Sequence, residues 1–324
     1  MRGRCNRRSR VRDQPVPCAV RAGQIWSFLM TIQSLPSRFA GPEAAHPASE
    51  AGTQLSARLE IIPTDGIVSK VQAHVPAGST LTVTCLPHHG VRATMEASVQ
   101  LGRLGYNVIP HLAARSLESR AQLAEILRDC EASGIMEVFA IGGDAPHAAG
   151  PYNNSGRLME DIADMTGGNF AVGVAGYPEG HPGHNELHML DALLEKQHLA
   201  SNVVTQMCFS AQRISWYAEL LRREGVELPI WAGVAGTVPR AKLIALATKI
   251  GVGPSLKFLN RKGPLARRLL NAGSYSSQSL IAELSAARPA LAGIHLYSFN
   301  NFEGHSATLG TAPASTLQVR GVSF

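Results

Sequence analysis

Eight short apolar runs, each rich in residues that favour strands, recur along the chain from residue 57 onward. They span 58–63, 80–85, 106–111, 135–142, 170–177, 202–209, 228–234 and 290–299. Segments with helical periodicity separate them, at 92–104, 116–133, 156–165, 185–198, 211–224, 239–250 and about 264–287. Strands that alternate with helices pair in parallel, because a parallel neighbour is reached only through a crossover of about a dozen residues or more. Eight such units in about 250 residues favour a single-domain α/β fold, a closed (β/α)8 TIM barrel, over an open sheet.

Residues 1–55 differ from the rest of the chain, being rich first in Arg and then in Pro, Ala, Ser and Gly. We expect a disordered tail, either a targeting segment or the product of an early start codon with the natural start at Met30. The catalytic barrel would then cover 56–305, and a C-terminal tail 306–324. Eight Arg and three acidic residues lie within 1–50, which leaves 22 basic and 21 acidic residues beyond. The net charge of +6 therefore describes the tail, and no nucleic-acid partner is predicted.

The composition is that of a globular chain, with 45% apolar and 17% charged residues. No run approaches the roughly 18 to 20 apolar residues that a membrane span needs, so no membrane partner is predicted. The five cysteines form no CxxC pair, which favours buried free thiols in a reducing, cytoplasmic compartment. A homo-oligomer is compatible with these data.

Polar, small and aromatic residues recur at the carboxyl ends of the apolar runs. Barrel closure would gather these ends around one mouth, which is where such barrels bind ligands. Asp144, for example, follows a run that stops at Gly142 and Gly143. The others lie within 82–90, 110–112, 175–182, 205–206 and 295–301, with Glu60 in the first run and Gly233 in the seventh.

Glu60 is the one carboxylate inside its run. If it faces inward, its carboxyl group lies in a medium of low dielectric and is suited to donating a proton near neutral pH. The alternative is an outward-facing Glu60 that pairs with Arg58 or Lys70.

A metal centre has to be weighed because histidines cluster near the predicted mouth. His181, His184 and His188 follow HxxHxxxH spacing, and His88, His89 and His111 lie at other strand ends. Pro182 and Gly183 interrupt the spacing and no HExxH motif is completed, so a solvated helix start is favoured and no metal is predicted. His111 is expected to form hydrogen bonds within the site. A dinucleotide GxGxxG motif, GxSxG and a P-loop are also absent from the sequence.

Taken together, the motifs resemble the methylenetetrahydrofolate reductase family over about residues 57–305. Leu59–Pro63 corresponds to the family's E-F-F-P-P, Pro110–Leu112 to P/L-H-L/M, and Ala140–Pro146 to A-L-R-G-D-x-P. Val174–Pro182 corresponds to V-A-G-Y-P-x-G-H-P, Val204–Gln206 to I-T-Q, and His295–Asn300 to H-F-Y-T-L-N.

This resemblance implies reduction of 5,10-methylenetetrahydrofolate to 5-methyltetrahydrofolate in one-carbon metabolism, with FAD relaying hydride from NAD(P)H. It implies that Glu60 is the general acid that opens the imidazolidine ring to a 5-iminium ion, and that Asp144 lies beside flavin and pterin. Gln206 and Tyr297 would contact the folate. The implied flavin-lining residues are Thr84, His111, Asp144, Ala175, Tyr177, His181 and Lys196.

The sequence also departs from the family motifs. Gly142 replaces an Arg, Met189 a ribose-binding Asp, and Ile61 and Ile62 two Phe residues, while 232–236 lacks the family's Pro-Gly pattern. Either FAD binds weakly or NAD(P)H delivers hydride directly to the iminium carbon. The sequence is also compatible with a barrel that runs the reaction in the catabolic direction and with a non-catalytic folate-binding barrel. The histidines would further allow a metal-dependent hydrolase.

Overall fold

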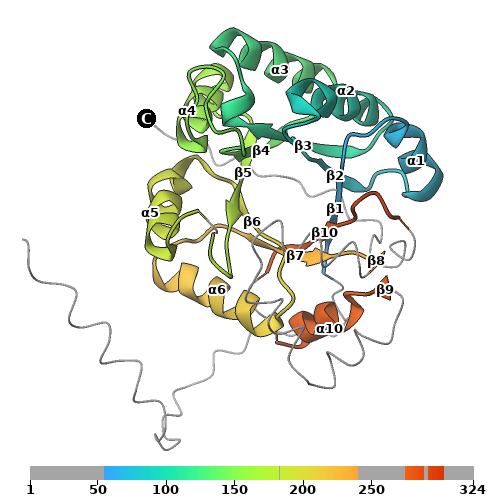
Figure 1. Cartoon of the computed structure of the whole chain (residues 1–324), viewed down its shortest axis with the longest axis vertical. Helices are drawn as coiled ribbons and strands as arrows, with labels where there is room; N and C mark the ends of the chain where they lie inside the picture. Colours follow the sequence, from blue (N-terminus) through green and yellow to red (C-terminus); the bar gives the residue numbers. More distant parts are fainter. Residues whose placement is uncertain (1–54, 182, 240–273, 288–290, 303–324) are drawn as a thin grey trace, which may run out of the picture. The chain divides into compact units, whose positions relative to one another are not determined.

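In the computed structural model of the protein, the residues described are 55–181, 183–239, 274–287 and 291–302. Eight parallel strands close into a barrel in the order β1-β10-β7-β6-β5-β4-β3-β2 (Figure 1). The strands are β1 (Ala57–Ile61), β2 (Thr80–Val83), β3 (Asn107–Ala113), β4 (Glu137–Ile141), β5 (Ala171–Gly176), β6 (Asn202–Thr205), β7 (Ile230–Ala235) and β10 (Gly293–Tyr297). The predicted (β/α)8 barrel is thus confirmed, and each predicted run contains one of these strands or most of it.

Helices lie between successive strands and cover the outside of the barrel (Figure 1). They are α1 (Ile67–His74), α2 (Gly90–Arg103), α3 (Arg120–Ala132), α4 (Ser155–Thr166), α5 (Glu186–Lys196), α6 (Ala211–Arg223) and α10 (Gln278–Ala287), with 3-10 turns η1 (Ala114–Ser116) and η2 (Gln197–Leu199). Helices α3 to α6 each begin after a Ser or Asn whose side chain accepts a hydrogen bond from the backbone three residues on. Such caps satisfy an amide that the helix itself leaves unpaired.

Two parts of the sequence-based prediction were wrong. Helix α1 was not predicted, because its eight residues bury only Ile67 and Val71 and give little periodicity. Pro239 was assigned to a helix, but it lies in β8 (Val238–Pro239), which pairs with β9 (Ser274–Tyr275) inside the second region predicted as helical. Proline fits the start of a helix or an edge strand equally well, since neither position requires its missing N–H.

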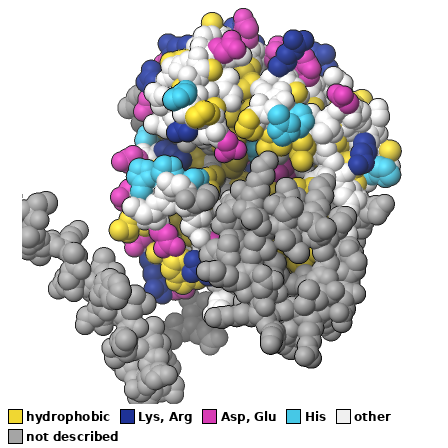
Figure 2. Space-filling model, in the orientation of Figure 1, with side chains coloured by type: hydrophobic (Ala, Val, Ile, Leu, Met, Phe, Trp, Pro, Cys, Tyr) yellow, Lys and Arg dark blue, Asp and Glu magenta, His cyan; other side chains and the backbone are white. Residues whose placement is uncertain are grey.

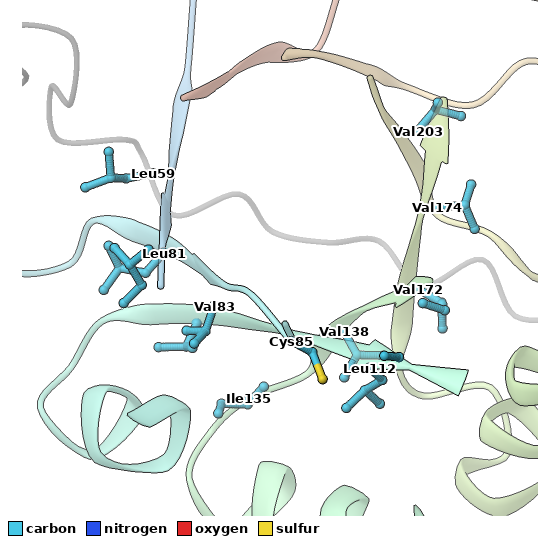
Figure 3. Packing of buried hydrophobic residues seen from close by; sticks show 14 of the residues in the cluster. Leu59, Leu81, Val83, Cys85, Leu112, Ile135, Val138, Val172, Val174 and Val203 are labelled. Atoms are coloured by element: carbon cyan, nitrogen blue, oxygen red, sulfur yellow. The ribbon is translucent and has the colours of Figure 1, made fainter. Parts of the chain in front are cut away.

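The buried hydrophobic side chains of the described residues form three clusters: a large shell outside the strands, a small cluster inside them, and a third made of Met207, Phe209, Ala235, Val238 and Tyr275. Leu59, Leu81, Val138 and Val174 belong to the outer shell and point away from the inside of the barrel (Figure 3). The inner cluster consists of Ile109, Phe139 and Val204, with Ile141, Ala175 and Trp231 packed against it. Side chains alternate along a strand, so the neighbours of Leu59, which are Arg58 and Glu60, face the interior.

Some predictions lie outside the described residues. These are the tails 1–54 and 306–324, the helix at 240–250 and the helical region at 264–273. None of the helices that the structure describes is long and apolar enough to cross a membrane.

Candidate active site

Glu60 lies near the carboxyl end of β1 and points into the barrel. Its Oε2 is 3.2 Å from Nε2 of His295 on β10 and 4.0 Å from Nε2 of His111 on β3. The outward orientation does not occur, because Arg58 bonds to Glu137 and Lys70 donates to the backbone oxygen of Asn300. The three side chains Glu60, His111 and His295 are 13%, 8% and 2% exposed. The carboxyl group of Glu60 and the imidazoles of His111 and His295 therefore lie together inside the barrel, largely shielded from solvent.

The charge state of His111 follows from its burial. Burial lowers the pKa of His111 from its usual 6.5 to about 4, although the Glu60 carboxylate opposes this shift. At neutral pH His111 is therefore an uncharged ring, which packs against the ring of Phe139 of the inner cluster in a tilted arrangement, with ring centroids 4.7 Å apart. Its Nε2 is buried and has no hydrogen-bond partner among the described residues. It can offer a polar contact to a ligand without adding charge.

Asp144 is exposed at the end of β4, in a loop that Arg115 holds in place. The Arg115 backbone N–H donates to the carbonyl of Gly142, and its guanidinium group donates to the carbonyls of Ala145 and Asn153. Gly143 has φ of +84° and lies close to Ala113, so this turn requires glycine. Sequence reasoning missed Arg115, although it lies only four residues beyond His111.

Tyr177 and His181 bring the loop after β5 to the same region as Asp144. Burial and the negative charge of Asp144 raise the pKa of Tyr177. Burial and the neighbouring His184 lower the pKa of His181, and Asp144 partly offsets this. These electrostatic couplings are consistent with the prediction that β4 and β5 contribute to one mouth.

The rings of Tyr177, His181, His184 and His188 form a row, with neighbouring centroids 4.9, 4.8 and 5.2 Å apart. Figure 2 shows histidine side chains gathered on the α5 side of this face. His188 lies in the first turn of α5, whereas His184 precedes the capping residue Asn185. Within the described ranges, no group of three or more His, Cys, Asp or Glu side chains is arranged to hold a metal ion.

Two other residues predicted to bind the cofactor carry polar groups with few or no hydrogen-bond partners among the described residues. The Thr84 hydroxyl, just beyond β2, is buried and has no partner among the described residues. The Lys196 amine donates to the hydroxyl of Ser155, 3.1 Å away, and burial lowers its pKa. A half-buried amine whose one partner among the described residues is a hydroxyl has capacity left for an anionic or polar ligand. Ala175, in contrast, offers only its methyl group, which packs on the inner cluster.

Gln206 and Tyr297 lie at neighbouring positions of the mouth. The Gln206 backbone N–H donates to the carbonyl of Gly176 at 2.7 Å, which fixes the chain just after β6. The Tyr297 hydroxyl donates to the carbonyl of Thr205 at 3.0 Å. A Cβ on Gly233 would lie 2.1 Å from that same carbonyl oxygen, so β7 can approach β6 here only with glycine.

The loop after β10 ties down the end of β1 and was not recognised from the sequence. Asn300 has φ of +59°, and its side chain accepts from the Ile62 N–H at 2.8 Å and donates to the Ile62 carbonyl at 2.9 Å. The Ser298 hydroxyl donates to the backbone carbonyl of Glu60. Asn tolerates this left-handed conformation better than most residues. The backbone that carries Glu60 is therefore fixed from the opposite end of the chain.

Comparison with known proteins adds to this geometry. The family model of methylenetetrahydrofolate reductase matches residues 66–309. The chain belongs to the methylenetetrahydrofolate reductase family. Glu60 precedes the matched range, so its role is inferred from the geometry and from the motif around it.

Individual relatives match at modest identity. The chain is 28% identical to 5,10-methylenetetrahydrofolate reductase of Pectobacterium carotovorum subsp. carotovorum over 228 residues, which cover 65% of this chain and 72% of the relative. The corresponding enzyme of Salmonella typhimurium is 27% identical over 225 residues, 65% of this chain and 73% of the relative. Methylenetetrahydrofolate reductase 2 of Saccharomyces cerevisiae is 26% identical over 176 residues, half of this chain but only 29% of the yeast protein.

Proposed function

We propose that this protein reduces 5,10-methylenetetrahydrofolate to 5-methyltetrahydrofolate with NAD(P)H, and that Glu60 is the general acid. The observation that carries the proposal is the position of the Glu60 carboxyl group. It lies on the inner wall at the mouth of a barrel of this family, beside two imidazoles and with no Lys or Arg bonded to it among the described residues. In such barrels this end of the strands is where catalysis takes place.

The chemistry requires a proton and a hydride. The bond between the bridging methylene carbon and N10 breaks, its electron pair stays on N10, and Glu60 protonates that nitrogen. The remaining 5-iminium ion takes a hydride that originates from NAD(P)H, which gives the methyl group and NAD(P)+. Glu60 is left as a carboxylate and recovers its proton from water. A positioned acid of this kind typically contributes about 10²- to 10⁴-fold in rate.

Asp144 and Gln206 would act on the same intermediate. A fixed carboxylate close to the iminium ion stabilises its positive charge, and this is the role we propose for Asp144. The support is its loop, which Arg115 anchors at the end of β4. Gln206 and Tyr297, beside the backbone contacts of β6, are proposed to orient the folate ring.

Some of the residues expected to bind FAD have side chains suited to that cofactor, and others do not. Thr84, His111 and Lys196 present buried or half-buried polar groups with spare hydrogen-bonding capacity, as a flavin ring or phosphate needs. Gly142 and Met189 provide no charge where the family motif has Arg and Asp. We therefore propose that FAD, whose role when bound is to relay the hydride, is held by Thr84, His111, Tyr177 and Lys196 with reduced affinity.

The visible absorption spectrum of the purified protein tests the flavin directly. A bound flavin gives a band in the blue region, and titration of the stripped protein with FAD gives the affinity. Turnover without any flavin would instead support direct transfer from NAD(P)H to the iminium carbon.

The activity is tested by following NADH and NADPH oxidation with methylenetetrahydrofolate, with and without added FAD. If neither NADH nor NADPH is oxidised under any of these conditions, the proposal is overturned. Rates measured in both directions distinguish a biosynthetic from a catabolic enzyme. Tight folate binding without turnover in either direction would identify a non-catalytic barrel.

A further inference from the structure

The two carboxylate oxygens of Glu60 have different surroundings. Oε2 lies within hydrogen-bonding distance of His295 Nε2, at 3.2 Å, whereas Oε1 takes no hydrogen bond from any residue that the structure describes. His111 Nε2, at 4.0 Å from Oε2, is too far away for a hydrogen bond. Among the described side chains, His295 is thus the one placed to control the carboxyl group.

The surroundings of the His295 ring favour one of its two neutral tautomers. Its Nδ1 atom is buried and has no hydrogen-bond partner among the described residues. A hydrogen on Nδ1 would therefore be a buried N–H without an acceptor, and such groups are rarer than buried acceptors without a donor. The tautomer that carries its hydrogen on Nε2 avoids this cost and can donate to Glu60 Oε2.

The ring itself is held firmly. His295 is 2% exposed, and its ring meets the ring of Tyr297 edge to face at 4.8 Å. The Tyr297 hydroxyl is already used on the carbonyl of Thr205, so it does not compete for His295 or Glu60. In register, Tyr297 is opposite Glu60 and His295 is opposite Arg58, so the contact between Glu60 and His295 is diagonal across the β1–β10 pair.

We propose that His295 is a positioning residue whose Nε2–H occupies Oε2 of Glu60 and thereby places the acidic proton on Oε1. The inference rests on the proposed function, since it specifies which oxygen donates to N10. When Oε1 gives up its proton, the hydrogen bond from His295 also stabilises the carboxylate that remains. Among the described residues, the other titratable groups near this carboxyl are His111, which is uncharged at neutral pH, and Tyr297.

The tautomer can be measured without turnover. In full-length protein labelled with 15N-histidine, long-range 1H–15N spectra distinguish Nε2–H, Nδ1–H and doubly protonated rings, and the His295→Gln variant assigns the signals. We expect His295 to be in the Nε2–H form at pH 7, with the signal of the Nε2 proton shifted downfield by its hydrogen bond. That signal should move upfield in Glu60→Leu, which removes the acceptor, and move less in Glu60→Gln, which keeps an acceptor. A His295 ring in the Nδ1–H form, or signals that do not respond to Glu60→Leu, would overturn the inference.

Two amide substitutions give a matched kinetic test. The amide nitrogen of Gln takes the place of Nε2, whereas that of Asn takes the place of Nδ1. We expect His295→Asn to lower kcat by about tenfold or more, with the KM for folate changed by less than about twofold. A positioning residue can contribute less than the roughly 10²- to 10⁴-fold of the acid itself. His295→Gln should retain kcat to within about threefold, because the donor to Oε2 remains.

The outcomes separate the two proposals. An active wild-type enzyme in which the Asn and Gln variants lose activity equally would contradict the role of His295 and leave the proposed function in place. An inactive wild-type protein would contradict the proposed function, and the NMR measurement would still decide the tautomer. Circular dichroism of each variant checks that the barrel has folded.

Discussion

The guanidinium group of Arg58 and the carboxylate of Glu137 form a two-point ion pair inside the barrel, with Nη1–Oε1 and Nη2–Oε2 distances of 2.8 and 3.3 Å. The Asn202 amide also donates to Glu137, at 2.8 Å, and Arg58 lies 3.8 Å above the ring of Trp231. Arg58 and Glu60 face the same interior, but the cation is fully engaged with Glu137. Among the described residues, the ionisable neighbours of Glu60 are therefore the imidazoles of His111 and His295, an environment compatible with the proton transfer that we propose for it.

Removing Glu137 should destabilise the barrel, because Arg58 would remain as a buried charge without a partner. We expect Glu137→Ala to lower the free energy of unfolding by about 3 kcal/mol or more, as measured by urea denaturation. Glu96→Ala breaks an exposed ion pair with Arg92 on α2 and should leave the free energy of unfolding nearly unchanged, because solvent screens such pairs. Equal effects of the two substitutions would show that the interior pair is not structurally important.

An arginine at position 142 should strengthen flavin binding. A Cβ on Gly142 would meet no atom of the described residues within 4 Å, and Gly142 is not among the described residues with positive φ, so the backbone there can carry a larger side chain. A new charge-assisted hydrogen bond to the cofactor is worth roughly 1.5–3 kcal/mol, so Gly142→Arg should tighten FAD binding by about tenfold or more in a fluorescence titration.

Position 143 provides the control for that substitution. Gly143 has φ of +84°, and a Cβ there would lie 3.1 Å from Ala113, so Gly143→Arg should destabilise the loop rather than improve binding. An unchanged FAD affinity in Gly142→Arg would show that the missing arginine does not limit the flavin site.

Burial of neutral His111 should make the protein less stable in mild acid. Its pKa is about 4 in the folded protein and 6.5 as the ordinary value, so between these pH values the unfolded chain binds a proton that the folded protein does not. Stability therefore falls as the pH decreases through this window, by about 2 kcal/mol from pH 7 to pH 5 for this group alone.

Urea denaturation at the two pH values measures the effect of His111. His111→Phe removes the titrating group and keeps a ring against Phe139. The change in the unfolding free energy of this variant between pH 7 and pH 5 should therefore be smaller than that of the wild type by about 2 kcal/mol. A variant with the same pH dependence as the wild type would contradict the assignment of a depressed pKa to His111.

The sequence predicted all eight barrel strands, because buried parallel strands give continuous apolar runs that end in turn residues. It also predicted that Glu60, Asp144 and Gln206 lie at the same end of the barrel. The contact of Glu60 with His295 was not predictable, since it joins residues 235 positions apart and depends on barrel closure. Asn300 was missed for a similar reason, because its side chain bonds to the backbone just after β1, far away in the sequence, and no local pattern indicates this.

The short elements were not predicted from the sequence, for a different reason. Helix α1 and the β8–β9 pair contain too few residues for periodicity to decide between helix and strand. Tyr275 of β9 is buried against Phe209, with ring centroids 5.5 Å apart, so tertiary packing rather than local propensity accounts for its conformation.

The most direct test of the central claim is the turnover of Glu60→Gln with methylenetetrahydrofolate and NAD(P)H. Glutamine keeps the shape of the side chain and can still accept the hydrogen bond from His295, but it cannot supply the proton. We expect kcat to fall by about 100-fold or more, whereas Glu131→Gln, an exposed change on α3, should leave it unchanged. A Glu60→Gln enzyme with wild-type turnover would contradict the assignment of Glu60 as the general acid.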